Sequence, residues 1–309
     1  MEFRPIERAC DAFQQSVTAN QIEAMCQRAF GSGVRVRSAM ELGNGMYNNT
    51  YRVDVGENRP VILRVAPEPA RQYRIERGLM RNEYASVPFL TPIATMIPRT
   101  LAADFTHEII DRDYLFQTML DGIPGAEGIG LYPRSQRASF FQQMGEIAGR
   151  IHAVRGERFG PAAGPAFDTW SEAVIAFFTD LAADLNDTGL DSADVREVAA
   201  AADKHRAMLD EITEPRLLHG DLWIVNVMML PGAAEPTIIG VLDNDRTSWG
   251  PGVRLDDLHG GQETWYRKRR FLGHLRTSAV HCQCGSAVAA LSGQAHRCDP
   301  PGAAPVGKS

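Results

Sequence analysis

Three polar residues occupy fixed places in the second half of the chain. Asp221 follows a His-Gly pair, Asn226 lies five residues later, and Asp243 ends the apolar run 238–242. A carboxylate at the first place can accept the proton of a hydroxyl, while an amide and a second carboxylate can hold Mg²⁺ against phosphate oxygens. The pattern therefore predicts magnesium-dependent phosphoryl transfer, with Asp221 as the catalytic base and with Asn226 and Asp243 as metal ligands.

Asp245 competes with Asp243 for the metal role, because it lies only two residues further on. The apolar run ends directly before Asp243, and a strand of that extent delivers Asp243 first to the end of the strand. The interval after Asn226 suits two strands joined by the Gly- and Pro-containing loop at 231–236. We therefore prefer Asp243 to Asp245.

The turn at 219–222 reads His-Gly-Asp-Leu, whereas protein kinases have His-Arg-Asp. Together with Asn226, Asp243 and Arg246, this turn resembles the signature of the aminoglycoside phosphotransferase and choline kinase-like family, which phosphorylates small molecules. The resemblance implies a protein-kinase-like α+β fold with two lobes: an N-terminal lobe of antiparallel sheet plus helix, and a mainly helical C-terminal lobe. It also implies ATP or GTP as co-substrate, with Mg²⁺.

The resemblance implies further roles around the catalytic turn. Arg246 is expected to belong to the catalytic set, pairing with Asp221 or a nearby carboxylate and fixing its geometry. His219 is expected to be a buried imidazole that bonds to backbone and shapes the loop, rather than an acid or base. One of Asp256 and Asp257 is expected to support the loop.

The first half of the chain offers a matching nucleotide site. Arg64 lies in the run 61–65, where kinases carry a phosphate-binding Lys on a central strand. Arg is a departure, but its guanidinium also suits phosphate or a carboxylate. Glu83, in a helical pattern nineteen residues later, is the natural ion-pair partner.

Two more segments complete the expected nucleotide site. Residues 43–51 resemble the loop that covers nucleotide phosphates, since glycine permits close backbone approach, and they supply Gly45, Asn48 and Asn49. Residues 114–120 resemble the hinge strand. There we expect backbone contacts to adenine from Thr118 and Leu120, with Gln117 at the rear of the pocket.

Hydrophobic spacing and turn residues divide the chain into expected elements. Helical patterns cover residues 6–30, 70–90, 135–154, 170–185 and 193–212. Strand patterns cover residues 34–42, 50–55, 60–65, 99–103 and 114–119. Two glycines and a proline within 121–125 favour a turn. We therefore expect a nucleotide-binding lobe at 1–119, a catalytic and substrate lobe at 120–276, and a flexible tail at 277–309, whose composition cannot build a core.

The tail differs from everything before it, since it is rich in Gly, Ala, Pro and Ser and leaves little room for the helices that complete the larger lobe in relatives. An altered reading frame near the end is one hypothesis, which the encoding DNA would decide. The tail also gathers His281, Cys282, Cys284, His296 and Cys298. Their spacing matches no common zinc pattern, so we interpret them as an incidental cluster.

Composition limits the class of protein. A net charge of −6 argues against nucleic acid or an anionic membrane as the main partner. No apolar run reaches the length of a membrane span, and the first residues lack the apolar stretch of a signal peptide. The odd count of five cysteines argues against a secreted disulfide framework. We therefore expect a cytoplasmic protein.

The acceptor is predicted to be a small molecule with a hydroxyl group, with an aminoglycoside or another cationic antibiotic as first choice. An acidic stretch could line a pocket for a polycation or simply form a solvated face; its members are Asp180, Asp184, Asp187, Asp191 and Asp194. A metabolic kinase acting on choline, homoserine or a ketosamine shares the same core. A nucleotide-binding module without activity is an alternative from another class, motivated by Arg64 and the reduced C-terminal lobe.

Overall fold

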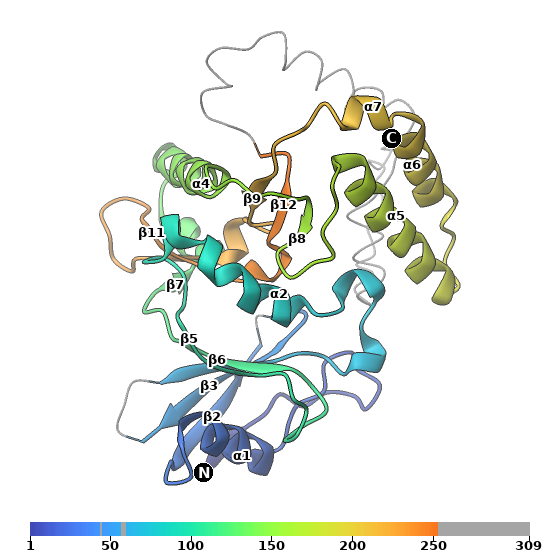
Figure 1. The fold of residues 1–309 in the computed structure, drawn as a ribbon. Helices are drawn as coiled ribbons and strands as arrows, with labels where there is room; N and C mark the ends of the chain where they lie inside the picture. Colours follow the sequence, from blue (N-terminus) through green and yellow to red (C-terminus); the bar gives the residue numbers. More distant parts are fainter. Residues whose placement is uncertain (44, 57–59, 253–309) are drawn as a thin grey trace, which may run out of the picture.

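The computed structural model describes residues 1–43, 45–56 and 60–252 of the chain, and within these it forms two lobes joined by α2 and by the segment after β6 (Figure 1). The small lobe contains a six-stranded sheet in the described residues, in the order β1-β2-β3-β4-β6-β5. Its strands are β1 (Glu2–Arg4), β2 (Val36–Leu42), β3 (Asn49–Val55), β4 (Val61–Val65), β5 (Thr100–Asp104) and β6 (Tyr114–Thr118). All neighbours are antiparallel except β1 and β2.

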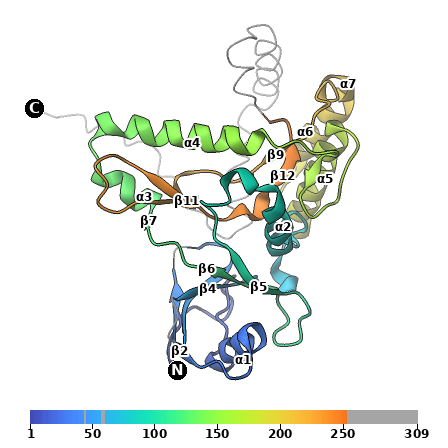
Figure 2. The same cartoon turned by 60° about the vertical axis from the view of Figure 1, so that its left-hand side comes forward.

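Alternating burial explains how the small-lobe sheet builds its core. Along β3 every second residue is buried, because successive side chains of a strand point to opposite faces. Tyr51, Leu63 and Phe116 are fully buried in the same cluster as Ile22 and Met25 of α1 (Ala19–Phe30). The helix therefore covers one face of the sheet, as Figures 1 and 2 show at the N-terminal end of the molecule.

The large lobe is mainly helical, with short strands around the catalytic turn. Its helices are α3 (Gly125–Gly128), α4 (Arg137–His152), α5 (Trp170–Asp187), α6 (Ala193–Lys204) and α7 (Arg206–Leu209). Its strands are β7 (Ile123–Pro124), β8 (Gly160–Pro161), β9 (Arg216–Leu218), β10 (Val227–Met229), β11 (Ile238–Val241) and β12 (Ser248–Gly250). They form two small sheets, β11-β10-β7 and β8-β12-β9, which pack with α4 around Phe140, Leu217 and Val241.

The protein-kinase-like α+β fold and the predicted strands are confirmed, but three predicted helices are wrong in extent. The helix expected at 6–30 begins only at Ala19, because Thr18 and Gln21 form a capping box that fixes its start. The one expected at 193–212 is interrupted at His205. The one expected at 70–90 is replaced up to Gly78 by the short 3₁₀ helices η1 (Pro69–Arg71) and η2 (Arg74–Glu76), and then forms α2 (Leu79–Ser86) and η3 (Val87–Phe89).

The chain crosses between lobes where the sequence predicted a turn. β6 ends at Thr118 in the small-lobe sheet, and β7 begins at Ile123, paired with β10 of the large lobe. The predicted tail and the residues after 252 lie outside the described residues, together with Asp256, Asp257 and the cysteine and histidine cluster. Among the helices that are described, none combines the length and apolar character needed to cross a bilayer.

Candidate active site

The catalytic turn leaves β9 and is shaped by a glycine. Gly220 has φ of 82°, a conformation that favours glycine, and a Cβ there would overlap the carbonyl group of Arg246. The loop at 219–223 therefore lies directly on the backbone of the 3₁₀ helix η8 (Asn244–Arg246). The sequence pattern His-Gly-Asp thus encodes a close approach that no other residue at 220 would allow.

Asp221 is partly buried and is fixed by Asn226. Asn226 is the last residue of the 3₁₀ helix η7 (Ile224–Asn226). Its Nδ2 donates to the backbone carbonyl oxygen of Asp221 at 2.9 Å and to Oδ2 of the Asp221 side chain at 2.8 Å. Burial and the nearby charge of Asp243 raise the pKa of the Asp221 carboxyl, against the opposing effect of Asn226 and Arg246. A raised pKa strengthens a carboxylate as a proton acceptor.

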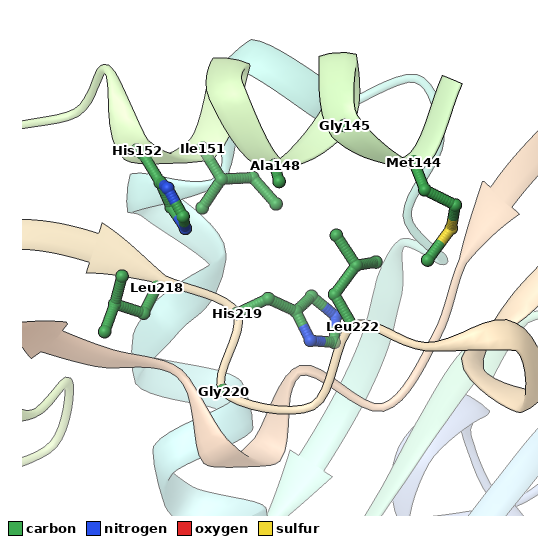
Figure 3. A pocket seen from close by; sticks show the side chains of 9 residues that line it. All are labelled: Met144, Gly145, Ala148, Ile151, His152, Leu218, His219, Gly220 and Leu222. Carbon is green, nitrogen blue, oxygen red and sulfur yellow. The ribbon is translucent and has the colours of Figure 1, made fainter. Parts of the chain in front are cut away.

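His219 lies on the side of this turn that faces α4 (Figure 3). It lines a cavity of about 360 Å³ between α4 and the turn, opposite Met144, Ala148 and Ile151 (Figure 3). Its Nδ1 faces the backbone N–H of Asp221 at 3.4 Å. Burial lowers the pKa of the imidazole to about 4, so that it is neutral near pH 7. The prediction of a buried imidazole bonded to backbone is confirmed.

Asn226 and Asp243 come together through the β10–β11 hairpin. Val227 pairs with Val241, and the N–H of Leu242 donates to the carbonyl oxygen of Asn226 at 2.8 Å. Asp243 follows β11 with φ of 60°, in the left-handed region of the backbone. About 37% of that side chain is exposed, whereas Asp245 is buried. The geometry therefore favours Asp243 over its competitor as the residue that faces a ligand.

This donor set fits Mg²⁺. The amide nitrogen of Asn226 faces Asp221, which leaves its Oδ1 directed elsewhere, and Asp243 offers a carboxylate. Among the described residues, no group of three or more His, Cys, Asp and Glu side chains could hold a metal ion alone. One amide oxygen and one carboxylate match the hard oxygen ligands of Mg²⁺, which is usually bound by one or two carboxylates together with substrate phosphates.

Arg64 joins the two lobes. Its Nη1 lies 2.5 Å from Oε2 of Glu83, and its Nη2 lies 2.5 Å from Oδ1 of Asp243. The predicted partner of Arg64 is thus in contact, and the candidate metal ligand is a second partner. Although burial alone would lower the pKa of Arg64, the carboxylates of Glu83, Asp243 and Asp245 raise it. Gln117 donates to Oε1 of Glu83 at 2.8 Å and so belongs to the same buried group.

The segment predicted to cover phosphates forms a tight loop before β3. The side chain of Gln14 donates to the carbonyl oxygens of Gly45 and Asn48 at 3.1 and 3.0 Å, which holds both arms of the loop. Oδ1 of the buried Asn48 has no hydrogen-bond partner among the described residues. Asn49 is different, since its side chain bonds to Glu41 and Arg112 inside the small lobe. Its side chain is therefore already engaged and is not available for the predicted nucleotide contact.

The structure also restricts the backbone contacts that were predicted for the hinge strand. The backbone N–H of Thr118 donates to the carbonyl oxygen of Arg99 at 2.9 Å. Because this N–H is engaged, the backbone contact predicted between Thr118 and adenine is restricted to the carbonyl group of Thr118. Leu120 follows, and its side chain packs on Gly240 of β11. Arg246, the last predicted residue, lies with Nη2 at 3.8 Å from Oε1 of Glu76, a carboxylate that the sequence analysis did not single out.

The comparison with known protein families agrees with the phosphoryl-transfer chemistry that this geometry suits. The model of the family described as Phosphotransferase enzyme family matches residues 38–253. The chain belongs to this family. It is a phosphotransferase of the small-molecule kinase type. No curated protein sequence matches the chain significantly.

Solved structures of similar fold include aminoglycoside phosphotransferases. One is a thermostable mutant of APH(4)-Ia with AMP-PNP and hygromycin B, at a TM-score of 0.53 and 20% identity over 89% of each chain. Another is the gentamicin complex of APH(2")-IIa, at a TM-score of 0.53 and 14% identity over 77% of this chain and 73% of that one. A third is a GDP complex of aminoglycoside 2'-phosphotransferase-IIIa, at 0.51 and 16% over 90% and 83%. At these identities the likeness shows the fold.

Sequence reasoning missed the residues that fix α2 of this phosphotransferase to its large lobe. The side chain of Asn82 donates to the carbonyl oxygens of Asp245 and Thr247 and accepts from the N–H of Ala163. Asn244 donates to Ser86 at 2.6 Å. These amides hold Glu83 in place for Arg64. An Asn beside the predicted Glu was the only signal, and it is too common to be informative.

The acidic stretch is mostly exposed, as expected for a solvated face, and Asp184 is the exception. Asp184 is buried and pairs with Arg74 at 3.0 Å, and Asp187 pairs with the same guanidinium at 2.6 Å. The carboxylate of Asp191 accepts from the N–H of Ala193 at the start of α6. Asp184 and Asp187 therefore attach η2 to α5.

Proposed function

We propose that the chain transfers the γ-phosphoryl group of ATP or GTP, with Mg²⁺, to a hydroxyl of an aminoglycoside or another cationic antibiotic. One observation carries the proposal: Asp221, fixed by Asn226, and Asp243, paired with Arg64, stand beside one hairpin. A base for the acceptor and a cation-lined place for phosphates are thus adjacent. The nucleotide would lie against residues 1–119 and the acceptor against residues 120–276.

In this reaction the acceptor oxygen forms a bond to the γ-phosphorus while the bond from that phosphorus to the β–γ bridging oxygen breaks. The hydroxyl proton passes to the Asp221 carboxylate, and the nucleoside diphosphate leaves. Asn226 orients Asp221 through its amide hydrogen bonds, and burial raises the pKa of Asp221 in the direction that helps it take this proton.

The Asn226 Oδ1 and the Asp243 carboxylate would hold Mg²⁺, which when bound neutralises charge on the phosphate oxygens. Arg64 is permanently charged and would face the phosphates from the small lobe, anchored by Glu83. Gly45, Asn48 and the backbone of Asn49 would cover the phosphates. The carbonyl of Thr118 and the backbone of Leu120 would contact the base.

The choice of acceptor is supported by two observations. Two of the similar structures contain hygromycin B and gentamicin, which are aminoglycosides. The net charge of −6 also favours a cationic acceptor over an anionic one. Such an enzyme would act in the cytoplasm, where nucleoside triphosphates are abundant, and would confer resistance on its host.

The test is a transfer assay with the full chain, Mg²⁺ and either ATP or GTP, in which mass spectrometry follows the acceptor. The panel holds hygromycin B, gentamicin, choline, homoserine and a ketosamine. We expect a mass gain of one phosphoryl group on an aminoglycoside and a raised inhibitory concentration in a susceptible bacterial host. Transfer only to choline, homoserine or the ketosamine would contradict the antibiotic acceptor and leave a metabolic kinase.

A nucleotide-binding module without activity is a second candidate, because Arg64 occupies one oxygen of Asp243, the carboxylate that a metal would need. This candidate predicts that the chain binds ATP with Mg²⁺ in calorimetry and yet phosphorylates no member of the panel. The first candidate predicts that Arg64 yields this oxygen when the nucleotide binds.

A further inference from the structure

Glu76 is a buried carboxylate that the proposed reaction does not use. It ends η2 and is only 5% exposed, and its Oε2 has no hydrogen-bond partner among the described residues. Burying a carboxylate without full hydrogen bonding is unfavourable, so each such group in a native structure calls for an explanation. Groups kept at a cost to stability cluster at functional sites.

The segment that carries Glu76 is firmly attached to the large lobe. Asp184 of α5 accepts from the backbone N–H groups of Arg74 and Ile75 at 3.0 and 3.2 Å and from Nη1 of Arg74 at 3.0 Å. Three charge-assisted hydrogen bonds to one buried carboxylate hold η2 in a single place. Glu76, the next residue, is therefore presented at a fixed position by α5.

From that position Glu76 reaches both sides of the candidate active site. Its Oε1 is 3.8 Å from Nη2 of Arg246, whose backbone lies against Gly220 of the catalytic turn. The charge of Arg246 also acts on Asp221. On the other side, the hydroxyl of Tyr47, from the loop proposed to cover the phosphates, donates to the carbonyl oxygen of Glu76 at 3.0 Å.

We propose that Glu76 is a positioning residue for phosphoryl transfer, which holds the Arg246 guanidinium beside Asp221 and beneath the phosphate-covering loop. This inference rests on the proposed function. Because Asp221 and a γ-phosphoryl group are both negative, a cation held near Asp221 offsets their repulsion as the acceptor approaches. Arg246 is one-third exposed, and without Glu76 its long side chain would be free to leave this place.

The test is Glu76→Gln, which keeps the shape of the side chain and removes its charge. We expect kcat to fall about tenfold, with the KM for nucleotide within about twofold of wild type, because the loss concerns the reacting complex. The melting temperature should stay unchanged or rise, since an incompletely bonded buried charge is removed. A merely structural residue would instead lower the melting temperature together with the activity.

A double-mutant cycle identifies Arg246 as the intermediary. Arg246→Gln should lower kcat at least as much as Glu76→Gln, and the double variant should be no slower than Arg246→Gln alone, because Glu76 acts only through Arg246. Arg246→Lys should recover part of the rate. Glu68→Gln is the matched control: it removes a carboxylate eight residues upstream whose partner, Arg71, lies 3.0 Å away on the surface, and it should leave kcat unchanged.

Three results would overturn the inference: wild-type kcat in Glu76→Gln, a fall in its melting temperature that parallels the fall in activity, or multiplying effects in the double variant. Should Glu76→Gln fail to fold, Arg246→Gln breaks the same pair from its exposed side, and wild-type kcat there would overturn the inference equally. A wild-type chain that phosphorylates no acceptor is a different result, because it contradicts the proposed function and the role of Glu76 with it.

Discussion

The two sides of the candidate active site hold their charges in different ways. On the nucleotide side, Arg64 and Glu83 are nearly inaccessible and contact each other at 2.5 Å. On the acceptor side, Asp221 is partly buried, and Arg246 lies 3.8 Å from its carboxylate partner and is one-third exposed. On the proposed nucleotide side the pair of Arg64 and Glu83 is thus formed before any ligand arrives, although Arg64 still has to release Asp243, whereas the proposed acceptor side keeps charged groups open to a substrate.

This difference has a physical reason. A nucleoside triphosphate presents the same phosphates in every turnover, so a preorganised buried ion pair costs nothing at the moment of reaction. An acceptor must bring its own hydroxyl to Asp221, and a tight ion pair there would compete with it. We therefore expect changes on the nucleotide side to affect stability and activity together, and changes on the acceptor side to affect mainly the rate.

A large effect is expected from Asp243→Ala, which removes the proposed metal ligand and one partner of Arg64. We expect kcat/KM to fall about a thousandfold, because charge stabilisation by a bound metal is worth several kcal/mol. Steady-state kinetics at saturating Mg²⁺ measure this. Asp168→Ala, which removes an exposed carboxylate paired with Arg158, serves as control. A variant within tenfold of wild type would show that Asp243 holds no essential metal.

The buried pair is tested next through stability. Arg64→Met leaves Glu83 buried without its cation and should lower the free energy of unfolding by about 3–5 kcal/mol. Adding Glu83→Leu should recover much of this loss without restoring activity, since two apolar side chains replace the pair. Urea unfolding and the transfer assay decide both points. Full stability in the single variant would mean that the nucleotide side is not preorganised as described.

Much of this arrangement could be predicted from the sequence. The hairpin that joins Asn226 to Asp243 and the strand of Arg64 follow from local periodicity and short motifs, and the pairing of Arg64 with Glu83 follows from the resemblance to kinases; the structure places them accordingly. Glu76 and Asn82 could not be predicted in the same way. Their roles depend on contacts with residues more than a hundred positions away, which no local pattern encodes.

The same limit explains the errors. The helical pattern at 70–90 was interpreted from spacing alone, whereas η2 is fixed by hydrogen bonds to Asp184, about 110 residues later. Asn49 was assigned to a ligand because of its place after a glycine-rich loop, but its side chain completes a buried network with Glu41. Tertiary hydrogen bonding outweighed local preference in both cases.

The pH dependence of folding stability tests the small lobe through the buried carboxylate of Glu41. Burial alone would raise the pKa of Glu41, but hydrogen bonds from the Ile6 N–H, Ser16, Asn49 and Arg8 outweigh it and lower the pKa. A folded-state pKa below the unfolded value of about 4.3 means that stability is complete above that value and is lost as the pH falls through the folded pKa.

We therefore expect acid unfolding of the wild-type chain to begin below about pH 4. Glu41→Gln should be less stable near neutral pH and should show a weaker dependence of the unfolding free energy on pH in the acid range. Urea unfolding at a series of pH values measures this. Parallel curves for the two proteins would contradict the role of Glu41.

The smallest effect is expected at the surface. Asp187→Asn removes an ion pair to Arg74 whose carboxylate is 63% exposed, and it should change the free energy of unfolding by no more than about 1 kcal/mol. Asp184→Asn, which alters the buried partner of the same guanidinium, should cost more. Thermal unfolding of both variants at equal salt concentration compares them. Equal losses would remove the distinction between the exposed and the buried partner.

The central claim is that Asp221 accepts the hydroxyl proton next to a separately assembled nucleotide site. The most direct measurement compares wild type with Asp221→Asn, using calorimetry for ATP binding with Mg²⁺ and phosphorus NMR for transfer to the acceptor. We predict equal nucleotide affinity, with transfer in the variant slower by a factor of about 10²–10⁴. Transfer at the wild-type rate in Asp221→Asn, or loss of nucleotide binding together with transfer, would contradict the claim.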